Sequence, residues 1–192
     1  MPMEDIVRTD DKLDKVILIG MMGAGKTTVG RLLAKHLNKQ FVDSDDEIQR
    51  RTGVTIAHIF DLEGEEGFRQ RESQALEEIL ARNDIVLATG GGAPLKPSNR
   101  ELLQRSGVVV YLKSNVQDLW HRTRHDQSRP LLRTADPKAK LQKLYDERDP
   151  IYSSIADIVI HTGKQNVQVL LGKLQDLLAE YAKGTQKKKE GH

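Results

Sequence analysis

The segment from Gly20 to Thr27 constrains most strongly how this chain can fold. It reads Gly-Met-Met-Gly-Ala-Gly-Lys-Thr and fits the pattern G-x-x-x-x-G-K-[ST] at every fixed position. An apolar run of β type precedes it at residues 16–19, and a segment with helical spacing of apolar residues follows it. The glycines let successive backbone N–H groups converge on one point, and the helix start adds the positive end of its dipole. The segment therefore predicts a cradle for nucleotide phosphates.

Two side chains in this segment have direct chemical roles in such a cradle. The ammonium group of Lys26 can reach the outer phosphates, and the hydroxyl of Thr27 can ligate Mg²⁺. A phosphate-binding loop alone is shared by kinases, ATPases and GTPase switches, so the other loops must distinguish among these classes.

Composition excludes several other functions. The chain has 192 residues, which suits one domain, and a net charge of only +2, which favours neither nucleic acid nor a membrane surface as a partner. Aromatic residues make up 4%, too few for base-stacking platforms, and there is no cysteine for disulfides or thiolate metal sites. The N-terminus lacks the pattern of a signal peptide, and no apolar run is long enough to span a membrane. We expect a cytoplasmic protein.

Five apolar runs of β type alternate with helical segments along the chain. The runs lie at about residues 15–19, 41–42, 85–88, 108–112 and 157–161. Such alternation predicts an α/β fold with a parallel sheet covered by helices on both faces, and with its functional loops at the carboxyl ends of the strands. We expect a flexible arm at 1–14, a single domain at 15–182 and a disordered Lys-rich tail at 183–192. One helix is expected to begin at Asp136 and Pro137 and to end near Pro150.

The acidic residues that follow the second strand separate the remaining classes. A motor ATPase typically carries an acidic pair where the third strand here continues into Thr89 and Gly90, and a GTPase carries Asn-Lys-x-Asp after a late strand. Neither pattern is present. Asp43 and Asp45 instead stand two residues apart, so that one carboxylate can face Mg²⁺ and the other a substrate hydroxyl. The alternative is an Asp-rich loop that only caps the next helix.

Two arginines are candidates for binding the other end of a substrate. The guanidinium groups of Arg69 and Arg148 match a carboxylate in geometry and charge. Spacing alone favours surface ion pairs for each, Arg69 with Glu65 and Arg148 with Asp146. Taken together with a hydroxyl-accepting aspartate, however, they describe a pocket for a polyhydroxy acid.

Residues 122–134 break the helical pattern. The segment holds four arginines and no apolar stripe, so we expect a mobile lid over the phosphates; the arginines are Arg122, Arg124, Arg129 and Arg133. His121 and His125 are four residues apart, but no third ligand completes a metal site.

Between about residues 14 and 180 the chain resembles the shikimate kinases. The shared segments are Gly20–Thr28, Asp43-Ser44-Asp45, residues 64–69, Gly90-Gly91-Gly92-Ala93, Arg129-Pro130-Leu131-Leu132 and residues 145–152. The phosphate-binding loop is generic, but the ordered set is specific. The resemblance implies a fold like that of the nucleoside monophosphate kinases, with a five-stranded parallel sheet, a substrate-binding region at about 43–72 and a lid at about 122–134.

The resemblance also implies a reaction and a set of site residues. ATP would phosphorylate the 3-hydroxyl of shikimate, a step toward chorismate and the aromatic amino acids, in an enzyme that we expect to be a monomer. Shikimate would lie against Asp45, Arg69, Gly90, Gly91, Gly92 and Arg148. ATP would lie against Gly23, Ala24, Gly25, Lys26, Thr27 and Thr28, with Arg129 closing on its phosphates and Arg122 and Gln165 near the adenine. Mg²⁺ would be held directly by Thr27 and through water by Asp43.

Two alternatives remain open at this point. A gluconate-type kinase shares the fold and also needs aspartate and arginine for a polyhydroxy acid. A nucleotide-dependent switch acting on a partner protein is less compatible with a triple glycine and a separate hydroxy-acid pocket.

Overall fold

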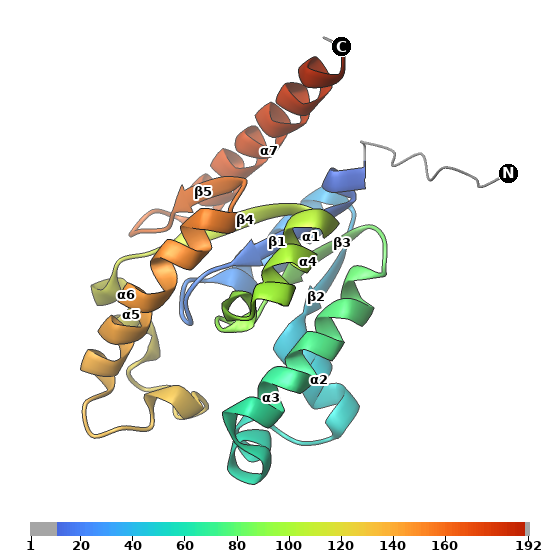
Figure 1. Ribbon diagram of the computed structural model, residues 1–192. Helices are drawn as coiled ribbons and strands as arrows, with labels where there is room; N and C mark the ends of the chain where they lie inside the picture. Colours follow the sequence, from blue (N-terminus) through green and yellow to red (C-terminus); the bar gives the residue numbers. More distant parts are fainter. Residues whose placement is uncertain (1–10, 191–192) are drawn as a thin grey trace, which may run out of the picture.

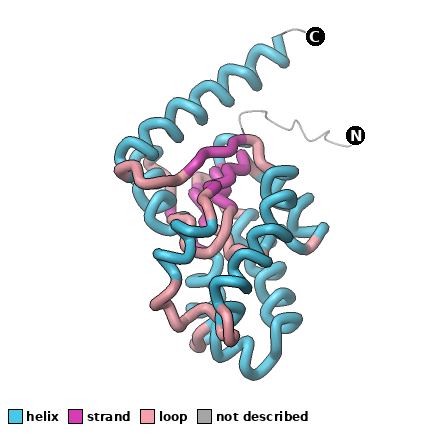
Figure 2. The backbone as a smooth tube through the Cα atoms, turned by 90° about the vertical axis from the view of Figure 1, so that its left-hand side faces the viewer, coloured by secondary structure: helices cyan, strands magenta, loops and turns pink. Residues whose placement is uncertain are grey.

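The computed structural model describes residues 11–190, which form a parallel sheet enclosed by helices (Figures 1 and 2). The strands are β1 (Lys15–Ile19), β2 (Gln40–Asp43), β3 (Ile85–Ala88), β4 (Val108–Lys113) and β5 (Ile158–His161). They run in the order β2-β3-β1-β4-β5, and every neighbouring pair is parallel. The five-stranded α/β architecture predicted from the sequence is confirmed.

The central strands are apolar along nearly their whole length because both of their faces are covered. Every residue of β3 and the first five residues of β4 are buried, as are the last four of β1. Runs of valine, isoleucine and leucine without alternation are what a parallel sheet covered on two sides requires.

Between residues 11 and 190, seven α-helices connect and cover the strands. They are α1 (Lys26–Leu37), α2 (Ser44–Thr52), α3 (Ile56–Leu80), α4 (Pro97–Ser106), α5 (Val116–Thr123), α6 (Pro137–Ile155) and α7 (Val167–Glu190). The helices α1 and α7 contact each other on one face of the sheet, whereas α4 and α6 contact β4 from the other. None of the helices between residues 11 and 190 has the length and apolar character needed to cross a membrane.

The functional loops meet at one edge of the sheet. The register pairs Leu18 with Ala88 and Asp43 with Ala88, so β1, β2 and β3 end side by side. The phosphate-binding loop, the start of α2 and the triple glycine each follow one of these ends, as predicted. In Figure 1, α3 and the segment that joins α5 to α6 both extend below the sheet.

Local sequence signals set the ends of the substrate-side helices. The carboxylate of Asp43 caps α2 by accepting hydrogen bonds from the N–H groups of Asp45 and Asp46, and Gly53 ends that helix with φ of 71°. Thr55 caps α3 through the N–H of His58. Gly64, with φ of 69°, interrupts α3 with a kink that a residue with a side chain rarely adopts.

The predicted boundaries need three corrections. Residues 183–190 continue α7 rather than forming a disordered tail, because lysine, glutamine and glutamate are good helix formers that extend an existing helix at little cost. Residues 11–14 of the predicted arm form a short 3₁₀ helix (η1), and Asp14 accepts a hydrogen bond from the N–H of Asp84. The rest of the arm and residues 191–192 lie outside the described residues. Finally, α6 passes Pro150 and ends at Ile155.

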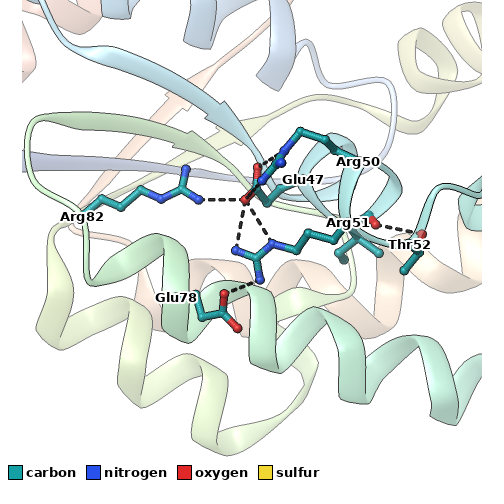
Figure 3. Close-up of polar contacts among 7 residues, drawn as sticks. Glu47, Arg50, Arg51, Thr52, Glu78 and Arg82 are labelled. Carbon is teal, nitrogen blue, oxygen red and sulfur yellow. Dashed lines mark hydrogen bonds and ion pairs between the residues drawn. The ribbon is translucent and has the colours of Figure 1, made fainter.

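A cluster of ion pairs fastens α2 to its neighbours, as Figure 3 shows. The nearly buried carboxylate of Glu47 accepts hydrogen bonds from Arg50 and Arg51 on α2 and from Arg82 in the turn before β3. Arg51 also pairs with Glu78 of α3 at 2.5 Å. Hydrogen bonds from Arg50, and then those from Arg82 and Arg51, lower the pKa of Glu47 to about 2. The cluster holds the helix that carries Asp45 against the edge of the sheet.

We expect Glu47→Gln to lower the free energy of unfolding at pH 7 by about 1.5–3 kcal/mol, the contribution of hydrogen bonds to a charged group. A depressed native pKa gives stability that is present above the usual value of 4.5 and lost as pH falls toward 2, so the difference between the two proteins should shrink over that range. Urea unfolding at several pH values measures it. Glu78→Gln is the matched control: among the described residues that half-exposed carboxylate pairs with Arg51 alone, so the substitution should cost less than about 1 kcal/mol. Equal losses in the two variants would contradict this role of Glu47.

Candidate active site

A cleft of ≈ 690 Å³ opens at the carboxyl edge of the sheet and brings most of the predicted site residues together. Its lining includes Gly23, Gly25, Lys26, Thr27 and Thr28 of the phosphate-binding loop, with Asp43, Asp45, Gly90, Gly91 and Arg129 from three other parts of the chain. Ala24, also predicted, is buried beneath the loop. A hollow of ≈ 720 Å³ between α2 and α3 is as large, but its arginines Arg50, Arg51 and Arg71 are already paired with glutamates.

Lys26 lies at the base of the cleft. Its Nζ donates hydrogen bonds to the carbonyls of Gly20 (2.7 Å) and Met21 (2.8 Å), which place the ammonium group inside the curl of the loop. Burial, and secondarily the positive charge of Arg129, lowers the pKa of Lys26 to about 8. The group is therefore still mainly cationic at neutral pH, at the point where a phosphate would lie.

The two residues predicted to hold a metal touch each other. The hydroxyl of Thr27 donates to Oδ2 of Asp43 at 2.8 Å, while Oδ1 of Asp43 accepts from the start of α2. A hydroxyl and a carboxylate at the edge of a phosphate-binding loop are oxygen donors of the kind that Mg²⁺ prefers, with phosphate oxygens and water supplying the other ligands. Within residues 11–190 there is no group of three or more histidine and carboxylate residues that could hold a metal ion without such help.

The triple glycine forms a floor on which four charged side chains lie. A Cβ atom at Gly90 would stand 2.8 Å from Oδ1 of Asp45 and 2.8 Å from Oε2 of Glu72. At Gly91 it would stand 3.2 Å from Nη1 of Arg148, and at Gly92 it would overlap the guanidinium group of Arg69. Glycine at all three positions is therefore what allows these carboxylates and guanidinium groups to converge.

The converging side chains line a second pocket next to the cleft. Besides Asp45, Arg69, Glu72, Arg148 and the three glycines, its wall contains Met22, Ile56, Phe60, Phe68, Arg129, Pro130 and Leu131. Arg69, Arg148 and Asp45, predicted from different segments, thus face one space. Apolar side chains close it, while the polar groups supply opposite charges at defined places, as is typical of a small-molecule site.

The two predicted arginines differ in how their charge is balanced. Arg69 donates to Glu72 at 2.8 Å and to Glu65 at 3.2 Å, so the ion pair suggested by spacing does form. Arg148 is only 2% exposed, yet no carboxylate in the described part of the chain lies within salt-bridge distance of it. A buried cation is costly without a partner, so a ligand carboxylate fits this place well.

Sequence reasoning missed three polar side chains of this site. Glu72 is fully buried and binds Arg69, while Ser44 accepts a hydrogen bond from the N–H of Gly90 and so ties the ends of β2 and β3 together. The hydroxyl of Tyr152 donates to the carbonyl of Gly91. Glu72 was the one with a detectable signal, since it follows Arg69 by three residues on a helix. The other two contacts depend on tertiary packing.

Two carboxylates of the pocket carry oxygens without partners. Oδ1 of Asp45 and Oε2 of Glu72 are buried and accept no hydrogen bond from any described residue. Burial, and secondarily the neighbouring Asp43, raises the pKa of Asp45 to about 6. Burial also raises the pKa of Glu72 to about 7, although Arg69 opposes the shift. The Asp45 side chain as a whole lines both the cleft and the second pocket.

The lid segment at 122–134 is partly helical and partly packed against the core. Arg122 and Thr123 belong to α5, a short 3₁₀ helix (η3) spans Pro130–Leu132, and Leu132 is buried, so the expectation of a loop from 122 to 134 without core contacts is corrected. Arg129 reaches both the cleft and the second pocket.

Nη1 of Arg122 donates to the carbonyl of Gly23 at 3.0 Å, beside the phosphate-binding loop. Gln165 contacts Lys173 and the carbonyl of His161 in a separate hollow, and does not line the cleft.

Comparisons with known proteins agree with this geometry. The family model described as shikimate kinase matches residues 22–179. A curated shikimate kinase of Chromobacterium violaceum is 55% identical over 163 residues, which cover 85% of this chain and 89% of the relative. The structure of shikimate kinase from Acinetobacter baumannii in complex with shikimate superposes with a TM-score of 0.86 at 45% identity, covering 91% of this chain and 98% of that one.

A more distant neighbour shares the architecture only. A gluconokinase from Sinorhizobium meliloti 1021 has a TM-score of 0.64 at 18% identity and covers 94% of this chain and 99% of its own. The fold by itself therefore does not distinguish a shikimate kinase from a gluconokinase. The sequence does, because the family model and the curated relatives match most of the chain. This chain belongs to the shikimate kinase family.

Proposed function

We propose that this protein transfers the γ-phosphoryl group of ATP to the 3-hydroxyl of shikimate, giving shikimate 3-phosphate and ADP. The observation that carries the proposal is the convergence of Asp45, Arg69 and Arg148 on the triple glycine, next to a phosphate-binding cleft. The family relationship supports the same reaction.

The charges of the second pocket fit a hydroxylated carboxylic acid. Arg148, buried and without an ion-pair partner among the described residues, suits the carboxylate, and Arg69 supplies a second guanidinium group beside it. Asp45 suits a hydroxyl, because it lines both the cleft and the acceptor pocket and its carboxylate accepts no hydrogen bond from the described residues. Asp43 is less suited to this role, since both of its carboxylate oxygens already accept hydrogen bonds. We therefore assign the attacking hydroxyl to Asp45.

The cleft supplies what phosphoryl transfer requires. The acceptor oxygen bonds to the γ-phosphorus while the bond from that phosphorus to the bridging oxygen of ADP breaks, and the hydroxyl proton leaves toward Asp45. The protein contributes mainly positioning and cationic stabilisation. Lys26 and Arg129 bring positive charge to the transferring group, and Arg129 lies where it can contact both substrates. Thr27 and Asp43 would hold Mg²⁺, which neutralises phosphate charge when it is bound.

The monomeric state and the cytoplasmic location both stay predictions from the sequence.

Coupled ADP release tests the function directly. With ATP and Mg²⁺ present, we expect shikimate to accelerate ADP release by orders of magnitude over the reaction without acceptor, and gluconate to have little effect. Stimulation by gluconate and not by shikimate would assign the protein to the gluconate-type alternative. ADP release independent of both acceptors would favour the nucleotide-dependent switch.

The acceptor pocket yields a quantitative prediction. Arg148→Ala and Arg69→Ala should each weaken shikimate binding by about 10–150-fold, because each removes a charge-assisted contact worth about 1.5–3 kcal/mol. Calorimetric titration with shikimate measures the loss, and titration with ATP alone should show little change.

Arg71→Ala is the matched control for these variants. Arg71 is on α3, two residues from Arg69, but pairs with Glu63 and does not line the acceptor pocket. It should leave shikimate binding unchanged. If Arg148→Ala and Arg69→Ala weaken ATP binding as much as shikimate binding, these arginines belong to the nucleotide site instead.

The pKa values of two site residues predict a bell-shaped pH profile. Asp45 must be ionised to accept a hydrogen bond from the hydroxyl, so kcat/KM for shikimate should fall as pH drops below about 6. Lys26 must be charged, so kcat/KM should also fall as pH rises above about 8. Initial rates between about pH 5 and pH 9 measure both limbs. A value of kcat/KM that does not fall between about pH 6 and pH 5, as expected for a carboxyl with the usual pKa of 3.8, would contradict the burial of Asp45 as described.

A further inference from the structure

Asp126 stands at an unexpected place for an acidic residue. It lies in the segment between α5 and η3 that also carries Arg122, Arg124, Arg129 and Arg133, next to a cleft assigned to a polyanion. A carboxylate near nucleotide phosphates disfavours their binding unless its charge is balanced locally. Its contacts show how that balance is achieved.

Both oxygens of the Asp126 carboxylate are engaged within the segment. Oδ1 accepts hydrogen bonds from the backbone N–H of Ser128 at 2.9 Å and from the Ser128 hydroxyl. Oδ2 accepts from Nε of Arg129 at 2.9 Å. The N–H of Asp126 donates to the carbonyl of Thr123, a buried residue at the end of α5. Asp126 therefore links the rigid end of a helix to the side chain of Arg129.

The contact uses one edge of the guanidinium group and leaves the other free. No described residue accepts a hydrogen bond from Nη1 or Nη2 of Arg129. The same side chain lines the cleft, and its charge acts on both Lys26 and Asp45. An arginine held at Nε presents its two Nη groups as a fork, the form in which guanidinium groups bind phosphate oxygens.

We propose that Asp126 is a positioning residue that holds Arg129 in the orientation required for phosphoryl transfer. This inference rests on the proposed function, and specifically on the role of Arg129 there. A free arginine side chain samples many rotamers. The conformational entropy lost when it is ordered opposes closure of the lid segment in every turnover. Asp126 restricts those rotamers before the substrates bind. Hydrogen bonds from Ser128, and then from Arg129, outweigh burial and lower the pKa of Asp126, so the carboxylate is ionised at neutral pH.

The alternative is an ordinary ion pair on the surface. The side chains of Asp126 and Arg129 are 34% and 38% exposed, a range in which such pairs contribute little to stability. A test must therefore report on orientation rather than on folding. The same segment offers a control, since Arg133 forms a more exposed pair with Asp61 of α3 at 3.3 Å.

The test compares kcat and KM for Asp126→Ala, Asp126→Asn and Asp61→Asn, and for Asp126→Ala combined with Arg129→Ala. Asp126→Ala should lower kcat about 10-fold with the KM for shikimate unchanged. Asp126→Asn should lower kcat by less than Asp126→Ala, because its single amide oxygen can still accept from Nε, although its NH₂ group then replaces the oxygen that accepts from Ser128. Asp61→Asn should be neutral, and Asp126→Ala should add less than about 2-fold to Arg129→Ala because its effect passes through that arginine.

Several outcomes would overturn the proposal. The first is a kcat for Asp126→Ala within about 2-fold of wild type. The second is a loss of kcat in Asp126→Asn or in Asp61→Asn as large as that in Asp126→Ala. The third is a loss of kcat from Asp126→Ala that is as large in the Arg129→Ala background as in the wild type. A direct measurement separates this inference from the proposed function. Hydrogen exchange at Nε of Arg129, followed by NMR, should be slower in the wild-type protein than in Asp126→Ala whichever acceptor is used. Identical exchange would refute the contact, whereas slow exchange without shikimate kinase activity would leave Asp126 in place and reject the reaction.

Discussion

Lys26→Ala abolishes turnover while the protein stays folded: this is the largest single effect that we expect. Lys26 is the cation at the base of the cleft, and the core beneath α1 is built from Val29, Leu33 and Ala34 rather than from Lys26. Removing a charged donor from the transferring group should lower kcat by about 10³-fold or more. ADP release at saturating ATP and shikimate measures the loss.

Thermal unfolding is the control for Lys26→Ala. An unchanged melting temperature with lost turnover would place the defect in the chemistry. Near-normal turnover at saturating ATP would contradict the assignment of this loop to the phosphates. Lys39→Ala is a comparison variant, because Lys39 pairs with Asp84 away from the cleft and should leave kcat unchanged.

Arg129→Ala should lower kcat by at least about 10²-fold, with a smaller change in KM. Comparable arginines that stabilise transferring phosphoryl groups contribute about 10³–10⁵ in kcat, and an interaction made mainly in the transition state affects kcat more than KM. Arg129→Lys should recover little, because an ammonium group cannot keep the Nε contact with Asp126 and present a fork at the same time. Steady-state kinetics with each substrate varied in turn measures these effects.

Arg133→Ala is the control for Arg129→Ala. It removes an arginine from the same segment, but one that pairs with Asp61 and lines neither the cleft nor the acceptor pocket. It should change kcat by less than about 2-fold. Comparable losses in the two variants would mean that the charge of the whole segment matters and that Arg129 has no special position.

Much of the fold could be predicted because its signals are local. The apolar runs of β1, β3 and β4 mark buried parallel strands by composition alone, and Thr55, Gly53 and Asp136 cap or end helices by contacts within a few residues. Pro150 misled the prediction of the end of α6. The burial of Tyr152 and Ile155 beyond it holds the helix together despite the lost hydrogen bond.

The site was predictable where a residue type alone limits the chemistry. The phosphate-binding loop, Asp43, Asp45 and the triple glycine each follow a strand, so topology brings them to one edge. The absence of an ion-pair partner for Arg148 among the described residues could not be predicted, since spacing suggested Asp146. Glu72 was missed because a glutamate within a charged helical segment gives no sign of being fully buried. These features depend on which helix face packs against the floor of glycines.

The physical reason for glycine at these three positions is visible only in three dimensions. In the sequence, Gly90 to Gly92 resemble any flexible turn. In the structure, each marks a place where a charged side chain lies against the backbone, and Gly92 leaves no room for a Cβ beside Arg69. The turn is thus shaped by the acceptor pocket rather than by the need for a bend.

A competition experiment tests the central claim most directly. The protein is incubated with ATP, Mg²⁺ and equal concentrations of shikimate and gluconate, and the phosphorylated products are identified by mass and by ³¹P NMR. We predict one product, shikimate carrying a phosphate on its 3-hydroxyl, in an amount equal to the ADP formed. Phosphorylated gluconate, or ADP formed without either product, would contradict the assignment of this site to shikimate.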